Sequence, residues 1–278
     1  MAYKSIFAAL TNVRDVVPEL AYAQAMTEAQ DAHLEVLCVG IDPTPTMYFE
    51  IGSNAVVMHA GIEEAHARAK EIGDSVREFL EPSNLRWDVI SSVAVSAGVG
   101  RAVAGQARFS DLAVLRLPYG EGHAPEDSLV LEGLLFETDC PIVVVPDTAA
   151  SARPRKIVIG WNQSTEAMHA VRAALPFLKA AQSVHIAIID PPETGPERSD
   201  PGGPLAVYLA RHGIRSDIHV MTKQGLSVSQ RLAQHVTEMD ADMLVMGGYG
   251  HSRFREAVLG GATRDMLEHS KVPVFMAH

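Results

Sequence analysis

A glycine-spaced segment near the C-terminus carries the residues best suited to chemistry. After a short apolar strand at 243–246 the chain reads GGYGHSRFREAVLGGATRDML, with glycines at 247, 250, 260 and 261. Glycine lets backbone N–H groups approach an anion closely, and a helix N-terminus adds unpaired donors and the positive end of its dipole. The strand–loop–helix placement therefore predicts a loop that binds phosphate groups.

The segment differs from two familiar phosphate-binding motifs, because it contains neither GxxxxGK[ST] nor GxGxxG. A pair of glycines by itself would indicate only a turn, whereas the full spacing between a strand and a helix favours a ligand. His251, Arg253 and Arg255 would add positive charge at the rim of the loop.

The histidines give weaker patterns. His59 and His66 are seven residues apart on one expected helix, which is too wide for the paired histidines of a zinc helix. We therefore expect a solvated or partner-facing pair and no metal site. His33, His185 and His278 have no partner that spacing can name. No GxSxG turn or Ser-His-Asp arrangement points to a catalytic residue.

Composition narrows the class of protein. The 278 residues are 47% hydrophobic and 21% charged, as in an ordinary globular chain, and the formal net charge of −11 disfavours nucleic acid as a partner. Cys38 and Cys140 stand at apolar strand positions, so we expect buried, inert thiols. Neither a membrane-spanning run nor a signal peptide is evident, so we expect no membrane partner and a cytoplasmic location.

Strands and helices must alternate to position the glycine segment. Residues 167, 170, 171, 174, 175 and 178 form one apolar helical face, with Ser164 as its expected N-cap. Further elements are expected in the second half as strands at 183–189, 216–221 and 243–246, helices at 203–212, 228–239 and 262–268, and a last strand. This alternation predicts parallel strands with helices on both faces, because a parallel connection needs a crossover.

The chain also repeats itself. Lys4 and Lys156 each open an apolar strand, Asp111 and Asp242 each precede another, and each copy ends in a β-branched run with a proline. The offset between copies falls from 152 residues (4 to 156) to 131 (111 to 242), so the second copy is 21 residues shorter in its middle. The first copy accordingly has a long second helix at 55–79.

The repeat defines two domains, 1–147 and 154–278, joined by a small, proline-flanked linker. The pattern G-x2-G-x9-G, formed by Gly247, Gly250 and Gly260, resembles the ATP-binding signature of the universal stress protein family. The resemblance covers both copies and implies two tandem flavodoxin-like (adenine nucleotide α hydrolase-like) α/β domains. Each would have a five-stranded, mostly parallel sheet with helices on both faces.

The resemblance also implies a set of ligand-contacting residues. Glycines 247, 250, 260 and 261 would hold the phosphates, with His251 and Ala262 beside them. Asn162 and the backbone near Ile189 would contact the ribose and adenine, and Met246 would pack next to them. An Asx turn that starts the following helix is an equally good reading of Asn162. The cofactor would be ATP, with or without Mg²⁺.

Two departures from the family pattern stand out. Gly261 occupies the position of the usual Ser or Thr, so one phosphate donor is lost unless Thr263 supplies it. In the first copy, Arg116 stands opposite Gly247 and Tyr119 opposite Gly250, and the connection LPYGEGHAPEDSLVLEG is acidic. We therefore expect ATP only in the second domain.

The leading hypothesis is a non-catalytic stress-response protein that binds an adenine nucleotide in its second domain. The alternative is an interaction module without nucleotide binding, acting through protein contacts or another small ligand. Slow ATP hydrolysis ranks last, because no carboxylate near the glycine segment could position water. The resemblance also implies pairing of the final strands, 142–145 with 274–276, as an internal pseudo-dimer, and further homodimerisation.

Overall fold

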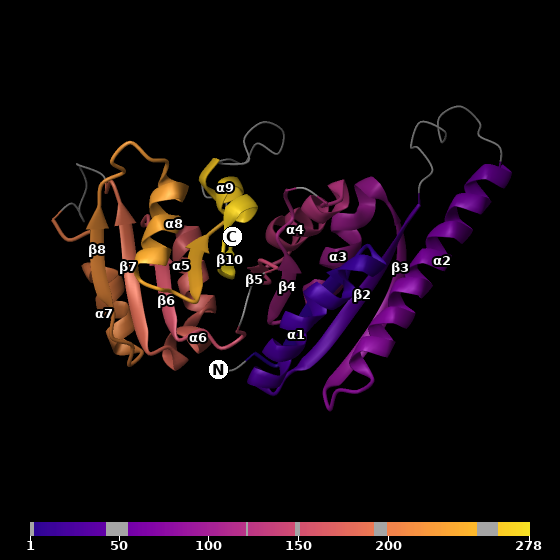
Figure 1. Cartoon of the computed structure of the whole chain (residues 1–278), viewed down its shortest axis with the longest axis horizontal. Coiled ribbons are helices and arrows are strands. Elements are labelled where there is room, and N and C mark those ends of the chain that lie inside the picture. The colour runs from indigo at the N-terminus through magenta and orange to yellow at the C-terminus, as the bar shows by residue number, and fades with distance from the viewer. Residues whose placement is uncertain (1–2, 43–54, 121, 148–150, 192–198, 249–260) are drawn as a thin grey trace. The chain divides into compact units, whose positions relative to one another are not determined.

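The computed structural model describes residues 3–42, 55–120, 122–147, 151–191, 199–248 and 261–278. Contacts between residues divide the chain into two compact units, Tyr3–Cys140 and Pro141–His278, called here the first and second unit. In the described residues the first sequence copy contributes strands β1–β5 and the second contributes β6–β10 (Figure 1).

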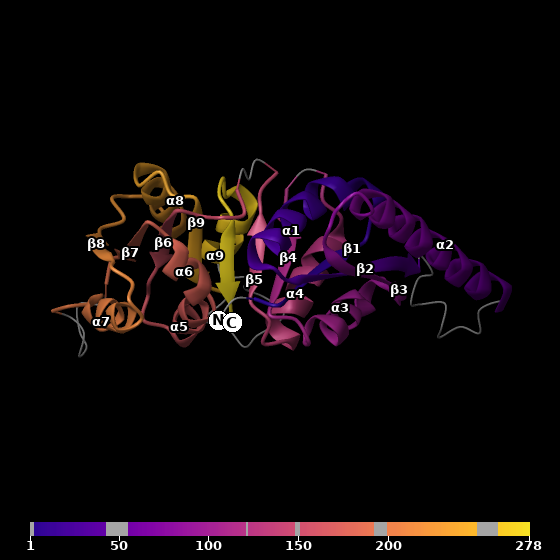
Figure 2. The same cartoon turned by 90° about the horizontal axis from the view of Figure 1, so that it is seen from below.

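The first unit contains a parallel sheet in the order β3-β2-β1-β4. Figure 2 shows α1 and α2 on one face of this sheet and α3 and α4 on the other. The elements of this unit are β1 (Ser5–Leu10), α1 (Val16–Gln30), β2 (His33–Asp42), α2 (Ala55–Leu80), β3 (Arg86–Val95), α3 (Val99–Ala107), β4 (Leu112–Arg116) and α4 (Pro125–Glu137).

The second unit has the strand order β5-β10-β9-β6-β7-β8, parallel except for β5. Helix α8 covers one face, and α5 and α7 cover the other (Figure 2). The elements of this unit are β5 (Ile142–Val145), β6 (Lys156–Gly160), α5 (Thr165–Ala173), α6 (Leu175–Ala180), β7 (Ser183–Ile189), α7 (Gly203–Arg211), β8 (Asp217–Met221), α8 (Val228–Glu238), β9 (Met243–Gly247), α9 (Gly261–His269) and β10 (Val274–Ala277).

The predicted α/β class, with five strands from each copy and helices on both faces, is confirmed. The predicted pairing of the final strands is also present, because β5 and β10 are antiparallel neighbours with Val143 opposite Phe275. This pairing places β5 in the second unit, so contacts divide the chain between Cys140 and Pro141, earlier than the repeat does.

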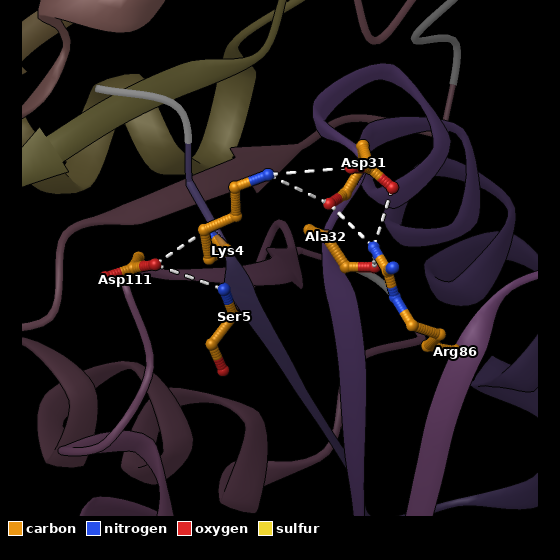
Figure 3. A network of polar contacts seen from close by, with 6 residues as sticks. All are labelled: Lys4, Ser5, Asp31, Ala32, Arg86 and Asp111. Carbon is orange, nitrogen blue, oxygen red and sulfur yellow. Dashed lines mark hydrogen bonds and ion pairs between the residues drawn. The ribbon is translucent and has the colours of Figure 1, made fainter.

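An aspartate before the fourth strand of each copy holds the start of the first strand. Asp111 Oδ2 accepts hydrogen bonds from the backbone nitrogens of Lys4 (2.7 Å) and Ser5 (3.1 Å), as Figure 3 shows. Asp242 Oδ2 accepts from Arg155 (2.7 Å) and Lys156 (2.9 Å) in the same way. The repeated Asp therefore has a structural cause, since it fixes two neighbouring strands at their amino ends.

One helix prediction was wrong. The apolar face from 167 to 178 belongs to two helices, α5 and α6, which meet at Ala174. Pro176 lies in the first turn of α6, where it lacks an N–H group and cannot continue the ladder of α5. The predicted N-cap is confirmed, because the Ser164 hydroxyl accepts a hydrogen bond from Ala167 N at 3.1 Å.

Both cysteines are buried, as predicted. Cys38 and Cys140 are free thiols, and burial raises the pKa of each to about 12. At neutral pH such thiols carry little thiolate, which is the reactive form. None of the helices in the described parts of the chain combines the length and apolar character needed to cross a bilayer.

Candidate functional site

The carboxyl ends of β6 and β9 define the place where this sheet would hold a ligand. The chain leaves β6 toward β7 on one side and leaves β9 toward β10 on the other, so the connections diverge between these two strands. Open α/β sheets bind ligands at such a switch point. Gly160 is paired with Met246 here, so the turns that follow the two strands begin side by side.

Asn162 lies in the turn after β6 and serves the local backbone. Its Oδ1 atom accepts a hydrogen bond from Ser164 N at 3.1 Å, and Gln163 between them has a positive φ of 64°. This is the Asx turn that the sequence allowed as one reading of Asn162. The side chain is exposed at the edge of the sheet, and contact with a ribose stays a prediction.

Gly247, the last residue of β9, is packed against the first turn of α5. A Cβ atom at Gly247 would lie 2.5 Å from Ala167 N and 2.8 Å from the carbonyl carbon of Glu166. Both neighbours are backbone atoms of a helix, so neither can move aside cheaply. Gly247 is therefore required by the close approach of strand and helix, whether or not a phosphate lies nearby.

The next residue is tied to the C-terminal strand. Gly248 N donates to Ala277 O at 2.9 Å, and His278 Nδ1 lies 3.0 Å from Gly248 O. The backbone of Gly248 thus extends the pairing of β9 with β10 by one residue. This contact supplies the partner for His278 that sequence spacing could not name.

The two predicted adenine-side residues lie on neighbouring elements of the same edge. Met246 is half-buried on β9 beside Gly160, and Ile189 is the half-buried last residue of β7, opposite Met221. Trp161 connects this edge to the start of α7, because its Nε1 atom donates to Pro201 O at 3.1 Å. The structure therefore brings Met246, Ile189 and Asn162 to the carboxyl edge of adjacent strands.

The centre of the glycine motif, Gly250, His251 and Gly260, lies outside the described residues. Gly261 is the first residue of α9 and is exposed, and no described atom lies within 4 Å of the position that a Cβ would take there. Ala262 follows in the same first turn. Since β9 and β10 are parallel, α9 runs back across the sheet and its N-terminus lies at the carboxyl edge.

Thr263, the alternative source of a hydroxyl, is buried, with 7% of its surface exposed. Its side chain is part of the packing of α9, in contrast to the exposed Gly261 two residues earlier. The hydroxyl missing at Gly261 is therefore not replaced by an exposed hydroxyl at Thr263.

The equivalent edge of the first unit, at the ends of β1 and β4, holds an internal ion pair. Arg116, which stands opposite Gly247 in the repeat, lies with its Nη1 atom 2.5 Å from Asp15 Oδ1. Both side chains are largely buried. The pocket that they line is small, with room for water but not for a nucleotide.

Further carboxyl groups crowd this small pocket. Glu19 is buried, and its Oε1 atom has no hydrogen-bond partner among the described residues. Desolvation raises the pKa of Glu19 well above its usual value, with the charges of Asp15 and Asp127 adding to the rise. Burial likewise raises the pKa of Asp15, against the opposing effect of Arg116. Acidic side chains thus lie at the edge of the first unit that is equivalent to the proposed phosphate position in the second unit.

Asp127 is fixed by its own helix. It caps α4 by accepting from Ala124 N at 2.9 Å, and its Oδ2 atom lies 3.5 Å from His123 Nδ1. The acidic connection noted in the sequence is therefore explained in part by helix capping, since a carboxylate at a helix N-terminus is favoured by the dipole.

Sequence reasoning missed two buried polar groups. One is the set Asp15, Glu19 and Arg116; the other is a stack of His185, His219 and His235 in the second unit. A histidine on the apolar face of the 228–239 helix, next to Val236, was the signal for the second group. In the described parts of the chain, no group of three or more His, Cys, Asp or Glu side chains is arranged to hold a metal ion.

The parallel sheet of the second unit has the turn of Asn162 and the N-terminus of α9 at its switch point. This arrangement defines an open α/β protein with its ligand edge between β6 and β9. Residues 154–278 match the sequence model of the Universal stress protein family. These residues therefore form a domain of this family, which supports a role in the stress response.

Solved structures share the fold over nearly the whole chain. A universal stress protein from Archaeoglobus fulgidus is 16% identical, with a TM-score of 0.67 over 98% of this chain and 97% of that one. A universal stress protein candidate from Pseudomonas aeruginosa is 13% identical, with a TM-score of 0.58 over 99% of this chain and 92% of its own. Comparison with the curated proteins gives no match.

Proposed function

We propose that residues 154–278 bind an adenine nucleotide, ATP in the first place, at the carboxyl edge between β6 and β9. The observation that carries this proposal is the convergence of three features at one switch point. These are the turn of Asn162 after β6, the glycine motif that starts at Gly247, and the N-terminus of α9 at Gly261. The match of this domain to the universal stress protein family supports the same ligand.

Each feature has a physical role toward the nucleotide. The N-terminus of α9 offers unpaired N–H groups and a positive dipole end to the phosphates. Met246 and Ile189 offer half-buried apolar surface to the base, next to the exposed amide of Asn162. His251, Ala262 and the remaining motif glycines, 250 and 260, would complete the phosphate loop, with Mg²⁺ as an optional companion.

The proposed role is binding without catalysis. Neither Asn162 nor the described glycines can act as a base toward water, and hydrolysis needs a group that positions the attacking water. Bound nucleotide would instead favour one state of the edge between β6 and β9, and partner proteins would recognise that state. We place the protein in the cytoplasm, where thiols stay reduced, because its two described cysteines are buried and free. We also propose that the protein forms a homodimer.

A second candidate is supported by the roles of Gly247 and Asn162. Both have complete structural explanations, in helix packing and in an Asx turn, that require no ligand. In that case the domain keeps the fold of the family but acts through protein contacts or through another small ligand.

Isothermal titration of the full chain with ATP distinguishes the two candidates. We expect saturable binding of one ATP per chain, lost in a Gly250→Glu variant that places a carboxylate in the loop. Arg116→Ala, in the first unit, is the control and should leave the stoichiometry unchanged. Absence of ATP binding by the unmodified protein would refute the proposal and leave the second candidate. A phosphate-release assay on the same sample tests hydrolysis.

A further inference from the structure

Three histidines from three elements stack on the α8 face of the second unit. His185 lies on β7, His219 on β8 and His235 on α8. His185 Nδ1 is 3.2 Å from His219 Nε2, and the rings of His219 and His235 have centroids 4.8 Å apart. The stack thus connects two neighbouring strands to the helix that covers them.

The stack is buried at its α8 end and partly exposed on the two strands. The side chain of His235 is 2% exposed, and both of its ring nitrogens are buried without a hydrogen bond of normal geometry to any described residue. His185 is 15% exposed. A buried imidazole is tolerated while neutral, whereas its protonated form needs compensation for lost hydration.

The surrounding charges compensate only weakly. Asp217 Oδ2 is 3.8 Å from His185 Nδ1, and Glu238 Oε2 is 3.5 Å from His235 Nδ1. Lys156 on β6 and Arg231 on α8 oppose a positive charge at His185 and His235 respectively. A proton on both His185 and His219 would also remove the acceptor from their 3.2 Å hydrogen bond and place two like charges in contact.

We propose that His185, His219 and His235 form an acid-sensitive latch, which holds α8 on β7 and β8 at neutral pH and releases it in mild acid. The latch is a property of the second unit by itself and does not depend on nucleotide binding. It acts next to the candidate site, because the Leu232 side chain of α8 lies against Gly160, and Ser229 donates to Asp265 of α9 at 3.1 Å.

The direction of the pH effect follows from proton binding. Desolvation, and next the charge of His219, lower the pKa of His185 and His235 below the ordinary value of 6.5. The unfolded chain therefore binds more protons than the folded chain once the pH falls below about 6.5. Stability is complete above that pH and is lost as the pH falls through it toward the lowered values.

The size of the effect has an upper limit. A histidine that titrates at 6.5 when unfolded and stays neutral when folded increases the unfolding equilibrium constant about tenfold between pH 7.5 and 5.5. The two histidines with a lowered pKa, His185 and His235, would together increase the unfolding equilibrium constant up to about a hundredfold.

The test uses the full chain and its two tryptophans, Trp87 in the first unit and Trp161 in the second. In a Trp87→Phe background, Trp161 fluorescence reports urea unfolding of the second unit at pH 7.5 and 5.5. We expect the acid-induced increase in the unfolding constant to drop about tenfold in His235→Phe, which keeps an aromatic ring and removes the proton site. His185→Gln is the second variant, on the less buried side of the stack.

The control is His66→Gln, an exposed histidine of α2 in the first unit, which should leave the acid response unchanged. If His235→Phe and His185→Gln both keep the full acid response, the latch is refuted. Hydrogen exchange, corrected for the intrinsic effect of pH, then locates the release. We expect α8 to lose protection at pH 5.5 before β6 does, and equal protection of α8 and β6 at both pH values would overturn the proposed release.

Discussion

The Cα of Gly247 on β9 and the backbone of Ala167 on α5 are so close that a Cβ atom at Gly247 would lie 2.5 Å from Ala167 N. This close approach connects the end of β9 to the first turn of α5, the helix that follows β6. The same glycine opens the predicted phosphate motif. Packing and ligand binding therefore place separate demands on one residue, and they can be tested separately.

Gly247→Ala should destabilise the second unit even in the absence of nucleotide. The methyl group would meet helix backbone, and such overpacking costs on the order of 1–3 kcal/mol. Urea unfolding followed by Trp161 fluorescence measures the loss. Gly261→Ala is the matched control. No described atom lies within 4 Å of the Cβ position there, so the change should be close to neutral. Equal stability of Gly247→Ala and the unmodified chain would show that the contact is not required.

Asp111 and Asp242 should contribute similarly to the two units. Each carboxylate accepts two backbone hydrogen bonds at the start of the first strand of its own copy. Replacement by Ala should cost about 1–2 kcal/mol, since hydrogen bonds to charged groups are stronger than neutral ones. Asp→Asn keeps an acceptor and should cost less.

The two tryptophans separate these effects. Asp111→Ala should lower the unfolding midpoint reported by Trp87, and Asp242→Ala the one reported by Trp161, each measured with the other tryptophan replaced by Phe. An equal loss in the Ala and Asn variants would contradict the hydrogen-bonding role of the carboxylates.

The sequence predicted helices and strands correctly where the local residue pattern and the tertiary packing agree. The Ser164 cap, the 183–189 strand and the long α2 helix were all readable from periodicity and capping. The break between α5 and α6 was not predicted, because the apolar positions continue in helical register on both sides of Pro176. Periodicity reports the buried face but not the interruption of the backbone ladder.

The site was predictable only in part, for a different reason. Gly247 was identified from its motif, yet its contact with Ala167 depends on which helix covers which strand, and spacing carries no such information. The same holds for Asp15 with Arg116, and for His185 with His219, which come from elements far apart in sequence. Such contacts are set by sheet order and helix placement.

Glu19→Gln should stabilise the first unit at neutral and alkaline pH. Burial raises the pKa of Glu19 well above the ordinary 4.5, so the folded chain retains a proton that the unfolded chain releases. Stability from this group is complete below about pH 4.5 and is lost as the pH rises toward the folded pKa. Gln is neutral at every pH and should gain on the order of 1–3 kcal/mol at pH 8.

Trp87 fluorescence in a Trp161→Phe background measures this gain in urea, at pH 8 and pH 5. We expect the advantage of Glu19→Gln to shrink at the lower pH. Glu28→Gln, at an exposed position of the same helix, should change stability little at either pH. An advantage that grows on acidification would contradict the assignment of a raised pKa to Glu19.

Gly261→Ser should strengthen ATP binding, if the second unit binds the nucleotide as proposed. Gly261 is exposed at the N-terminus of α9, and no described atom lies within 4 Å of its Cβ position, so a serine is accommodated by the described backbone. Its hydroxyl would add one hydrogen bond to a charged phosphate, about 1.5 kcal/mol, which corresponds to a roughly tenfold lower Kd. Gly261→Ala adds the carbon without the hydroxyl and should leave Kd nearly unchanged in calorimetric titration. Equal Kd values for the Ser and Ala variants would show that this hydroxyl position does not contact the nucleotide, even if ATP binds elsewhere on the edge.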